Sequence, residues 1–289
     1  MLHENELSGE IPSQIGNMSS LVTLNLSTNH LVGYIPCQIG HIKHLVALDL
    51  SSNNLFGKIP SSIGGLTELT SLYLYCNKLS GQIPRELGYL SNLLYLSLSE
   101  NILSGSIPNS IGNLTKLTTL SLSNNQLSGL IPQELDFLTN LEYLDLSENI
   151  FSGSIPNCIE NLTKLTILYL YSNQLSGHIP RELGLLVNLE DLELSDNTLT
   201  GSIPNSIGNL IKLTILNLFM NEISGHIPRE LGYLEKLEQL YLGTNTLIGS
   251  IPNSIGNLTK LTIMYLESNQ LSRHIPRELG RLENLGVGS

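Results

Sequence analysis

An asparagine recurs every 24 residues along this chain of 289 residues. The positions are Asn5, Asn29, Asn53, Asn77, Asn101, Asn125, Asn149, Asn173, Asn197, Asn221, Asn245 and Asn269. All 12 prolines keep the same spacing, from Pro12 to Pro276, and each follows an isoleucine. A fixed period of this length is the signature of one supersecondary unit stacked many times. The sequence therefore predicts a solenoid of about twelve 24-residue repeats.

The pattern within one repeat indicates a short strand followed by a chain that coils back. Leu24 and Leu26 alternate with polar residues, which is the period of a half-buried strand. The isoleucine before each proline is biased toward extended backbone, so a second short strand or an extended edge is expected there. The recurring glycine, beginning with Gly9, is expected to permit a positive φ or a close backbone approach. Arg273 replaces this glycine in the last full repeat, which predicts a looser structure locally.

The recurring asparagine has a structural explanation. Where the chain turns off the strand, backbone N–H and C=O groups point into the stack, and an unpaired buried group costs about 1–3 kcal/mol. A side-chain amide both donates and accepts hydrogen bonds. Stacked asparagines are therefore expected to form a ladder that satisfies the backbone of their own turn and of the neighbouring one.

The repeat resembles a known family. The segment LTTLSLSNNQLSGLIP is similar to the plant-type leucine-rich repeat, with its LxxLxLxxN core and SGxIP extension, and its relatives cover essentially the whole chain. The resemblance implies an α/β-type, mostly β solenoid: a right-handed superhelix with a parallel sheet on its concave face. It also implies one domain over residues 1–289. The family occurs mainly in extracellular domains of plant receptor kinases, in receptor-like proteins and in secreted inhibitors of polygalacturonases.

The sequence carries neither of the disulfide-bonded terminal caps that the resembled family has. We therefore expect an uncapped piece of a longer receptor, which would place the full protein at the plasma membrane and this part outside the cell. No stretch of the sequence reads as a signal peptide or as a membrane span.

The outward positions beside the inward leucines form the expected face for recognition. Eleven of the 25 acidic residues fall on these positions and no lysine or arginine does, so that acids and bases balance elsewhere. Eight of the 11 tyrosines share the face. Such a face favours a basic secreted peptide or protein, by steering, charge-assisted hydrogen bonds and stacking on tyrosine. Nucleic acid is disfavoured by the same negative sign.

The densest stretch gives the predicted ligand-binding residues, and a co-receptor ectodomain is a further possible partner. These residues are Tyr143, Asp145, Glu148, Tyr169, Tyr171, Glu190, Asp191, Glu193, Asp196, Asn217, Phe219 and Tyr241. The alternative interpretation is that tyrosine suits exposed strand positions and that acids keep an open sheet soluble. No catalytic residues, cofactor or metal site are predicted, because no constellation of His, Ser or Cys accompanies the acids.

Three functions are compatible with these patterns. The first is ligand recognition by a plant receptor ectodomain, the second is a secreted inhibitor of polygalacturonase, and the third is a truncated product without function. If the chain is exported, glycans are expected at five Asn-x-Ser/Thr sequons. These are Asn17, Asn25, Asn113, Asn161 and Asn257.

Overall fold

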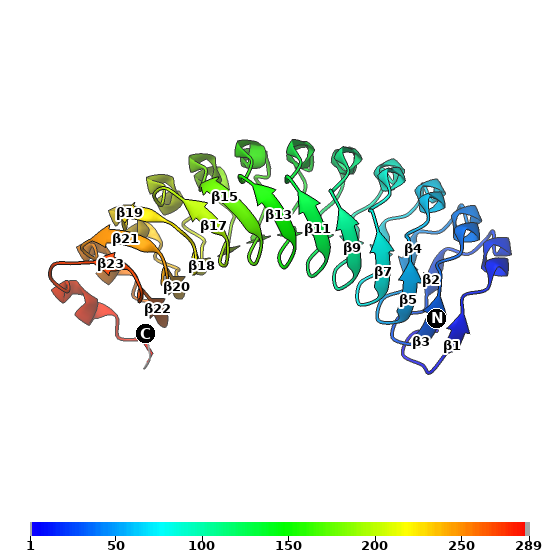
Figure 1. Ribbon diagram of the computed structural model, residues 1–289, viewed down its shortest axis with the longest axis horizontal. Helices are drawn as coiled ribbons and strands as arrows, with labels where there is room; N and C mark the ends of the chain where they lie inside the picture. The colour runs from blue at the N-terminus through cyan, green and yellow to red at the C-terminus, as the bar shows by residue number, and fades with distance from the viewer. Residues whose placement is uncertain (1, 287–289) are drawn as a thin grey trace. The chain divides into compact units, whose positions relative to one another are not determined.

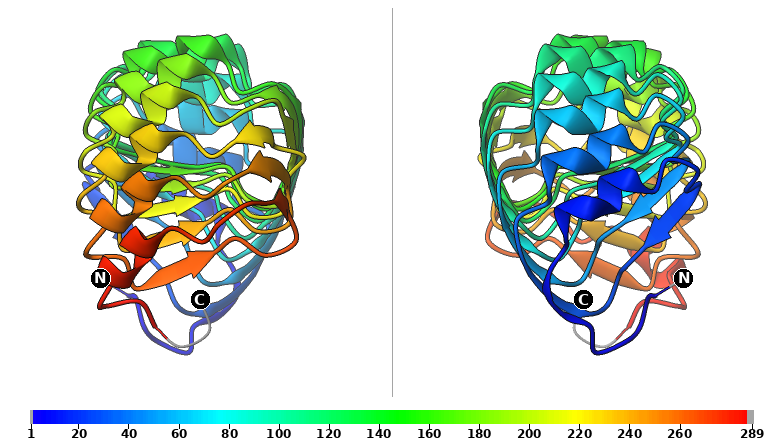
Figure 2. Two further views of the ribbon diagram at one scale, coloured as in Figure 1. Left: turned by 90° about the vertical axis from the view of Figure 1, so that its left-hand side faces the viewer. Right: turned by 90° about the vertical axis from the view of Figure 1, so that its right-hand side faces the viewer.

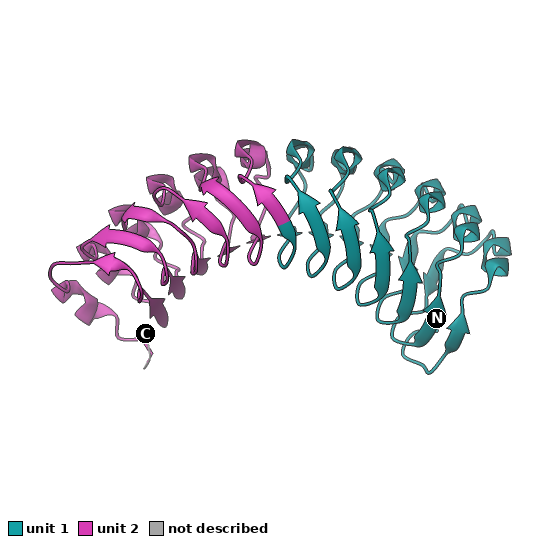
Figure 3. Cartoon of the chain, in the orientation of Figure 1, with its two compact units in different colours: residues 1–150 teal, residues 151–289 magenta. Residues whose placement is uncertain are grey.

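The computed structural model describes residues 2–286, and it divides into two compact units, residues 1–150 and 151–289 (Figure 3). The single domain over residues 1–289 stays a prediction. In both units a repeat consists of a first strand, a second strand and a 3-10 helix, except that the first described repeat begins directly with its second strand (Figure 1).

The first strand of each repeat carries the alternating leucines. In unit 1 these strands are β2 (Thr23–Asn25), β4 (Ala47–Asp49), β6 (Ser71–Tyr73), β8 (Tyr95–Ser97), β10 (Thr119–Ser121) and β12 (Tyr143–Asp145). In unit 2 they are β14 (Ile167–Tyr169), β16 (Asp191–Glu193), β18 (Ile215–Asn217), β20 (Gln239–Tyr241) and β22 (Ile263–Tyr265). Neighbouring strands within each unit pair in parallel with a shift of one repeat, for example Leu48 with Leu72 and Leu192 with Leu216. The predicted parallel sheet with 24-residue spacing is confirmed.

The second strand begins just after the recurring asparagine and usually ends at the recurring glycine. Each of these strands ends before the Ile-Pro of its repeat, and the prolines are extended but lie outside the strand. They are β1 (Ser8–Glu10), β3 (His30–Gly33), β5 (Asn54–Gly57), β7 (Lys78–Gly81), β9 (Ile102–Gly105), β11 (Gln126–Gly129) and β13 (Ile150–Gly153). The others are β15 (Gln174–His178), β17 (Thr198–Thr200), β19 (Ser224–His226), β21 (Thr246–Gly249) and β23 (Gln270–Leu271). The second strand therefore lies earlier in the repeat than Ile-Pro, where a strand or an extended edge was expected, and proline leads into the next element.

A 3-10 helix follows every proline, and the sequence patterns above did not predict it. Proline has φ between -61° and -70° at the helix start and the following turn closes onto its carbonyl, as in Ile111 N to Pro108 O at 2.9 Å. The helices are η1 (Ser13–Asn17), η2 (Cys37–His41), η3 (Ser61–Gly65), η4 (Arg85–Tyr89), η5 (Asn109–Asn113) and η6 (Gln133–Phe137). In unit 2 they are η7 (Asn157–Asn161), η8 (Arg181–Leu185), η9 (Asn205–Asn209), η10 (Arg229–Tyr233), η11 (Asn253–Asn257) and η12 (Arg277–Arg281). Within each unit they form a row of their own, apart from the strands (Figure 2).

The asparagine ladder is present in both units. Asn149 Nδ2 donates to the carbonyls of Leu122, Leu146 and Ser147 at 3.0–3.2 Å, and its Oδ1 accepts from Leu127 N at 3.0 Å. Asn221 makes the equivalent bonds in unit 2, again to its own turn and to the preceding repeat. The leucines beneath are fully buried, as Leu96 and Leu192 show. One amide per repeat thus bonds four backbone groups, and the carbonyls among them are shared with donors of neighbouring turns, as Leu122 O is shared with Asn125.

Two positions in each repeat take the left-handed backbone conformation. The recurring glycines have φ between 74° and 85°, as predicted, and Arg273 adopts φ 76° in the same place. The residue immediately before each ladder asparagine also has φ between 50° and 54°, from Glu4 to Ser268. The sequence gives no signal for this second position, because its residue type changes from repeat to repeat and includes Thr, Glu, Met and Asp.

Candidate recognition face

The outward side chains of the first strands, together with the two residues that follow each strand, are called here the strand face. In unit 2 the strand register places Tyr169, Glu193, Asn217, Tyr241 and Tyr265 in one row, each beside the next. Paired strands lie about 4.8 Å apart, so neighbouring members of this row are in contact range. Four of the five, all but Tyr265, were predicted as ligand-binding residues.

Two carboxylates lie side by side on β16 next to the tyrosine of β14. The Tyr169 hydroxyl donates to Asp191 Oδ2 at 2.6 Å, while the other Asp191 oxygen is buried without a hydrogen-bond partner. Burial raises the pKa of Asp191, and the bond from Tyr169 offsets part of the rise. The pKa of Glu193 is raised to about 7, first by burial and then by the charge of Asp191. Both acids are therefore held in a partly dry setting that opposes their negative charge.

Asn217 connects these acids to the next part of the strand face. Its side chain hydrogen-bonds to Glu193, which lowers the pKa of that acid and so opposes the effect of burial. Its Oδ1 also accepts from Phe219 N at 3.0 Å, which fixes the orientation of the amide. The amide nitrogen is thus the group available to donate to Glu193.

A hollow of about 310 Å³ lies beside Asn217 in unit 2. It is lined by Asn217, Phe219, Tyr241, Tyr265 and Glu267. The rings of Tyr241 and Tyr265 have centroids 5.3 Å apart and planes inclined by 36°. The Tyr241 hydroxyl donates to Gln239 Oε1 at 3.0 Å, and burial followed by the charge of Glu193 raises its pKa. Tyr265 and Glu267 were not among the predicted ligand-binding residues, although both lie on the strand face.

The other predicted residues of unit 2 are placed around this row. Tyr171 lies with its ring centroid 6.1 Å from that of Tyr169. Glu190 is exposed, and Asp196 accepts a hydrogen bond from Ser172 Oγ at 2.9 Å. Asp196 is one of the left-handed residues, with φ 53°, a conformation that Asp tolerates better than most residues. These side chains enlarge the acidic and aromatic surface within unit 2.

The three predicted residues of unit 1 have a different setting. Asp145 is buried, and its Oδ1 accepts from Ser147 N at 3.0 Å and from Ser147 Oγ at 2.6 Å. Tyr143 OH lies 3.3 Å from the other Asp145 oxygen. Glu148 is exposed at a left-handed position with φ 51°. Asp145 thus closes a turn in its own repeat, whereas Glu148 projects from the surface.

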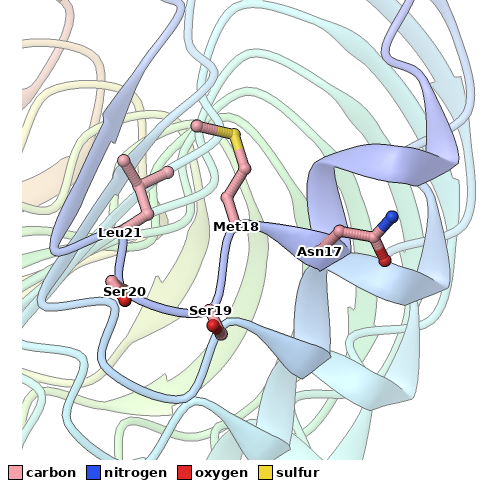
Figure 4. A pocket seen from close by; sticks show the side chains of 5 residues that line it. All are labelled: Asn17, Met18, Ser19, Ser20 and Leu21. Carbon is pink, nitrogen blue, oxygen red and sulfur yellow. The ribbon is translucent and has the colours of Figure 1, made fainter.

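Four of the five sequon asparagines lie at the last residue of a 3-10 helix and are exposed: Asn17, Asn113, Asn161 and Asn257. Asn17 borders a hollow of about 390 Å³ with Met18, Ser19, Ser20 and Leu21, and its amide points away from Met18 and Leu21 (Figure 4). Asn25 differs, because its Oδ1 accepts from Ser27 N at 2.9 Å and from Ser27 Oγ at 2.8 Å. The fifth sequon is therefore built into a turn of the strand face.

Among residues 2–286, no group of three or more His, Cys, Asp or Glu is arranged to hold a metal ion. Over the same range, none of the helices has the length and apolar character needed to cross a membrane. The described ion pairs join His44 to Glu68 and an arginine to the following glutamate in four repeats, and none includes Asp191, Glu193 or Glu267. The strand face therefore presents acceptor oxygens and aromatic rings to a partner.

Comparison with known proteins gives the family. A family model described as a leucine-rich repeat region matches residues 74–200 and 177–287. A second family model, for a single leucine-rich repeat, matches residues 20–42 and 44–66. No curated protein matches the chain.

Solved structures match over nearly the whole chain. The plant peptide hormone receptor RGFR1, in complex with RGF2, is 43% identical with a TM-score of 0.94, covering 98% of this chain and 45% of that one. The ectodomain of the Arabidopsis receptor kinase HAESA, in complex with an IDA peptide hormone, is 38% identical with a TM-score of 0.92, covering 97% and 47%. A second HAESA structure, with IDA and the co-receptor SERK1, is 30% identical with a TM-score of 0.57, covering 98% of this chain and 60% of that one.

A plant ice-binding protein is also similar, at 33% identity and a TM-score of 0.68, covering 79% of this chain and 74% of that one. This chain spans about half the length of the receptor ectodomains that it matches. Those receptors are extracellular, bind peptide hormones and have a non-catalytic fold.

Proposed function

Because the chain belongs to the leucine-rich repeat family and resembles plant receptor ectodomains, we propose that its strand face in unit 2 recognises a basic secreted peptide or protein. The observation that carries this proposal is the pair Asp191 and Glu193. They are partly buried, they lie beside tyrosines, and no ion pair among the described residues neutralises them. A cationic group on a ligand would supply the missing partner.

Such a ligand would gain binding free energy from two kinds of contact. A hydrogen bond to a charged group contributes about 1.5–3 kcal/mol, and a cation on a tyrosine ring adds about 0.5–2 kcal/mol. Since both raised pKa values oppose ionisation in the unbound chain, a cation would also restore the ordinary acidity of these groups.

The test is a binding screen with purified chain against a pooled synthetic library of secreted plant peptides, read by isothermal calorimetry on each hit. We expect Asp191→Asn together with Glu193→Gln to weaken a basic hit about tenfold or more. Glu235→Gln removes an exposed acid beyond the end of η10, away from the strand face, and should leave affinity unchanged. A hit that binds the double variant as tightly as the wild type would contradict the proposal.

The competing function is inhibition of polygalacturonase by a secreted protein of this fold. It predicts that the purified chain slows polygalacturonase and that no library peptide binds. An assay of ice recrystallisation on the same sample would test the chain for the activity of the ice-binding relative. Either result in the absence of peptide binding would replace the proposed function.

Export and partner assembly are parts of the same proposal. In the full-length protein this chain would lie outside the cell, with a co-receptor ectodomain as the second partner, as HAESA has in complex with SERK1. Glycans are proposed at the exposed sequons Asn17, Asn113, Asn161 and Asn257, and mass spectrometry after expression in plant cells would detect them. Asn209 ends η9 in the same way but lacks a sequon because Ile211 stands at the threonine position, so Ile211→Thr should add one glycan.

A further inference from the structure

Gly243 occupies a place where other repeats carry a side chain. It stands two residues before a ladder asparagine, and it is the one glycine among the residues at this position. The corresponding residues are His3, Ser27, Ser51, Tyr75, Ser99, Ser123, Ser147, Tyr171, Ser195, Phe219 and Glu267. On either side of Gly243 in this series stand Phe219 and Glu267, which are larger than the serine that six of the twelve repeats carry.

The backbone does not require glycine at this position. Gly243 is absent from the residues with positive φ, so an alanine could adopt its conformation. A Cβ atom added there would lie 2.6 Å from Glu267 Oε1 and 2.7 Å from Glu267 Cδ. The space above Gly243 is thus occupied by the end of one flexible side chain, which can move. The glycine provides room rather than a turn.

The Glu267 carboxylate that occupies this room also lines a hollow of about 310 Å³, together with Asn217, Phe219, Tyr241 and Tyr265. Its volume lies at the lower end of the range for ligand sites, roughly 300–1,000 Å³, which suits one large side chain better than a whole peptide. Phe219 and Tyr241 are half-buried walls, whereas Tyr265 and Glu267 are exposed. Three aromatic rings and one carboxylate therefore surround a space that solvent can enter.

We propose that this hollow, called the Gly243 notch, receives an arginine side chain of the peptide or protein partner. The guanidinium group is planar, stacks on aromatic faces and pairs with a carboxylate through two parallel hydrogen bonds. Tyr241 and Tyr265 supply the faces and Glu267 the carboxylate. Asn217 adds a polar group at the wall nearest Glu193. Lysine would keep the charge but lose the planar stacking and the paired hydrogen bonds.

This inference rests on the proposed function, since it names the ligand side chain that the strand face would bind. It places the anchor on β18 (Ile215–Asn217), β20 (Gln239–Tyr241) and β22 (Ile263–Tyr265), beside the acids of β16 (Asp191–Glu193). A basic ligand would then have two separate contacts on unit 2: a cation at Asp191 and Glu193, and an arginine in the Gly243 notch.

The probe is a blocked Gly-Gly-Arg-Gly-Gly pentapeptide, titrated into the full chain while the ring signals of Tyr241 and Tyr265 are followed by NMR. We expect saturable shifts of both rings, with at least about tenfold weaker binding of the counterpart that carries neutral citrulline. A lysine counterpart should be intermediate. Equal binding of the citrulline peptide would overturn the proposal, and equal binding of the lysine peptide would overturn the choice of arginine.

Gly243→Ser adds the side chain that six of the twelve repeats carry, and it would displace the Glu267 carboxylate from the wall of the notch. It should therefore weaken binding of the arginine peptide about tenfold or more. Ser195→Ala alters the equivalent position of β16's repeat and serves as the matched control. If circular dichroism shows that Gly243→Ser is misfolded, Gly243→Ala and Glu267→Gln test the same point with smaller changes. Unchanged affinity in the folded variants would overturn the notch.

The two proposals fail in different ways. If a library peptide depends on Asp191 and Glu193 while the notch variants bind the arginine peptide normally, the notch is wrong and the proposed function stands. If the arginine peptide binds in the notch but no library peptide binds the chain, the notch stands without a physiological ligand and the proposed function is contradicted.

Discussion

The strand faces of the two units use the same backbone for different purposes. In unit 1, Asn25, Asp49 and Asp145 each bond to a serine two residues further along, and so close a turn within their own repeat. In unit 2 the same strand position holds Tyr169, Glu193, Asn217, Tyr241 and Tyr265. Asn217 still closes a turn, at Phe219 N, but the Tyr169 hydroxyl bonds to Asp191 of the next repeat. The polar groups of unit 1 are largely satisfied internally, whereas the acids of unit 2 stay available to a partner.

The comparison shows that an acid on a repeat surface is not by itself a ligand-binding group. Asp145 and Glu193 occupy equivalent positions, and both are followed two residues later by a serine. The shorter Asp145 accepts from the N–H and hydroxyl of Ser147, which is fully buried. Glu193 is one methylene longer and instead takes its hydrogen bond from Asn217 in the next repeat. Side-chain length therefore separates a turn-closing acid from one that can contact a partner.

The largest expected effect concerns the feature that both units share. Asn149→Ala and Asn221→Ala should each lower the free energy of unfolding by about 2–3 kcal/mol, because one buried backbone N–H loses its acceptor and three carbonyls each lose one donor. Chemical denaturation measures this. Asn5→Ala is the control, since Asn5 is exposed and bonds only to the carbonyls of Leu2 and His3. A large loss in one unit and none in the other would show that the ladder differs between them.

The next prediction tests the difference between the two acids. Asp145→Ala should lower the free energy of unfolding by about 1–3 kcal/mol, because Ser147 loses an acceptor for two buried donors. Asp145→Asn should retain most of that stability, since Asn25 closes the equivalent turn with an amide oxygen.

Glu193→Gln should instead leave the fold intact and weaken a basic ligand. Binding measured beside denaturation separates the two effects. The comparison would break if Asp145→Asn weakened the ligand as strongly as Glu193→Gln.

The third prediction uses pH. The pKa of Glu193 is raised from 4.5 to about 7, so its neutral form is favoured in the folded chain. The stability from this group is fully present below pH 4.5 and is lost as pH rises through about 7. Because Glu193 is partly exposed, the loss is on the order of 1 kcal/mol.

Glu193→Gln should remove this part of the pH dependence of the unfolding free energy, whereas Asp145→Asn should leave it in place. Affinity for a basic ligand should change in the opposite sense and increase as pH rises toward 7, because ionised Glu193 is the form that pairs with a cation. A wild-type profile that is flat between pH 4.5 and 7 would contradict the pKa shift.

The smallest effect concerns the left-handed residue before the ladder asparagine. Met220 has φ 51° in unit 2, whereas unit 1 has an asparagine with φ 50° at the equivalent Asn124. Asparagine adopts this conformation more readily than methionine, so Met220→Asn should raise the free energy of unfolding by about 0.5 kcal/mol. Thermal melting detects such a change, and Asn124→Met should lower stability by a similar amount. If Met220→Asn lowered the free energy of unfolding and Asn124→Met raised it, side-chain contacts would outweigh the backbone preference at this position.

Much of the fold could be predicted because it depends on residues that recur. The leucines, the ladder asparagine and the left-handed glycine each have one physical role that tolerates few substitutes. The 3-10 helices were missed because their five residues share little except an apolar third position and, in most repeats, a glycine. The left-handed position before the asparagine was missed because the surrounding turn imposes it on whatever residue stands there.

The candidate site could be predicted only in outline. The row of acids and tyrosines follows from the alternation of the strand, but side-chain direction within the row does not. Asp145 shows this, because it bonds to Ser147 only as a result of its short side chain. The net charge of the strand face does not reveal such a bond. Gly243 was not among the predicted site residues, because a residue without a side chain gives no sign of a binding group. Comparing the residues two places before each ladder asparagine would have revealed it.

The ladder has a consequence for how such a chain can lengthen. Each asparagine contacts only its own turn, the preceding repeat's carbonyl and one backbone N–H of that same preceding repeat, as Asn149 shows. A copied repeat inserted by unequal recombination would thus meet the same partners as its parent. Gene duplication can extend the array while outward residues such as Glu193 and Gly243 diverge freely, so new specificities arise without a new fold.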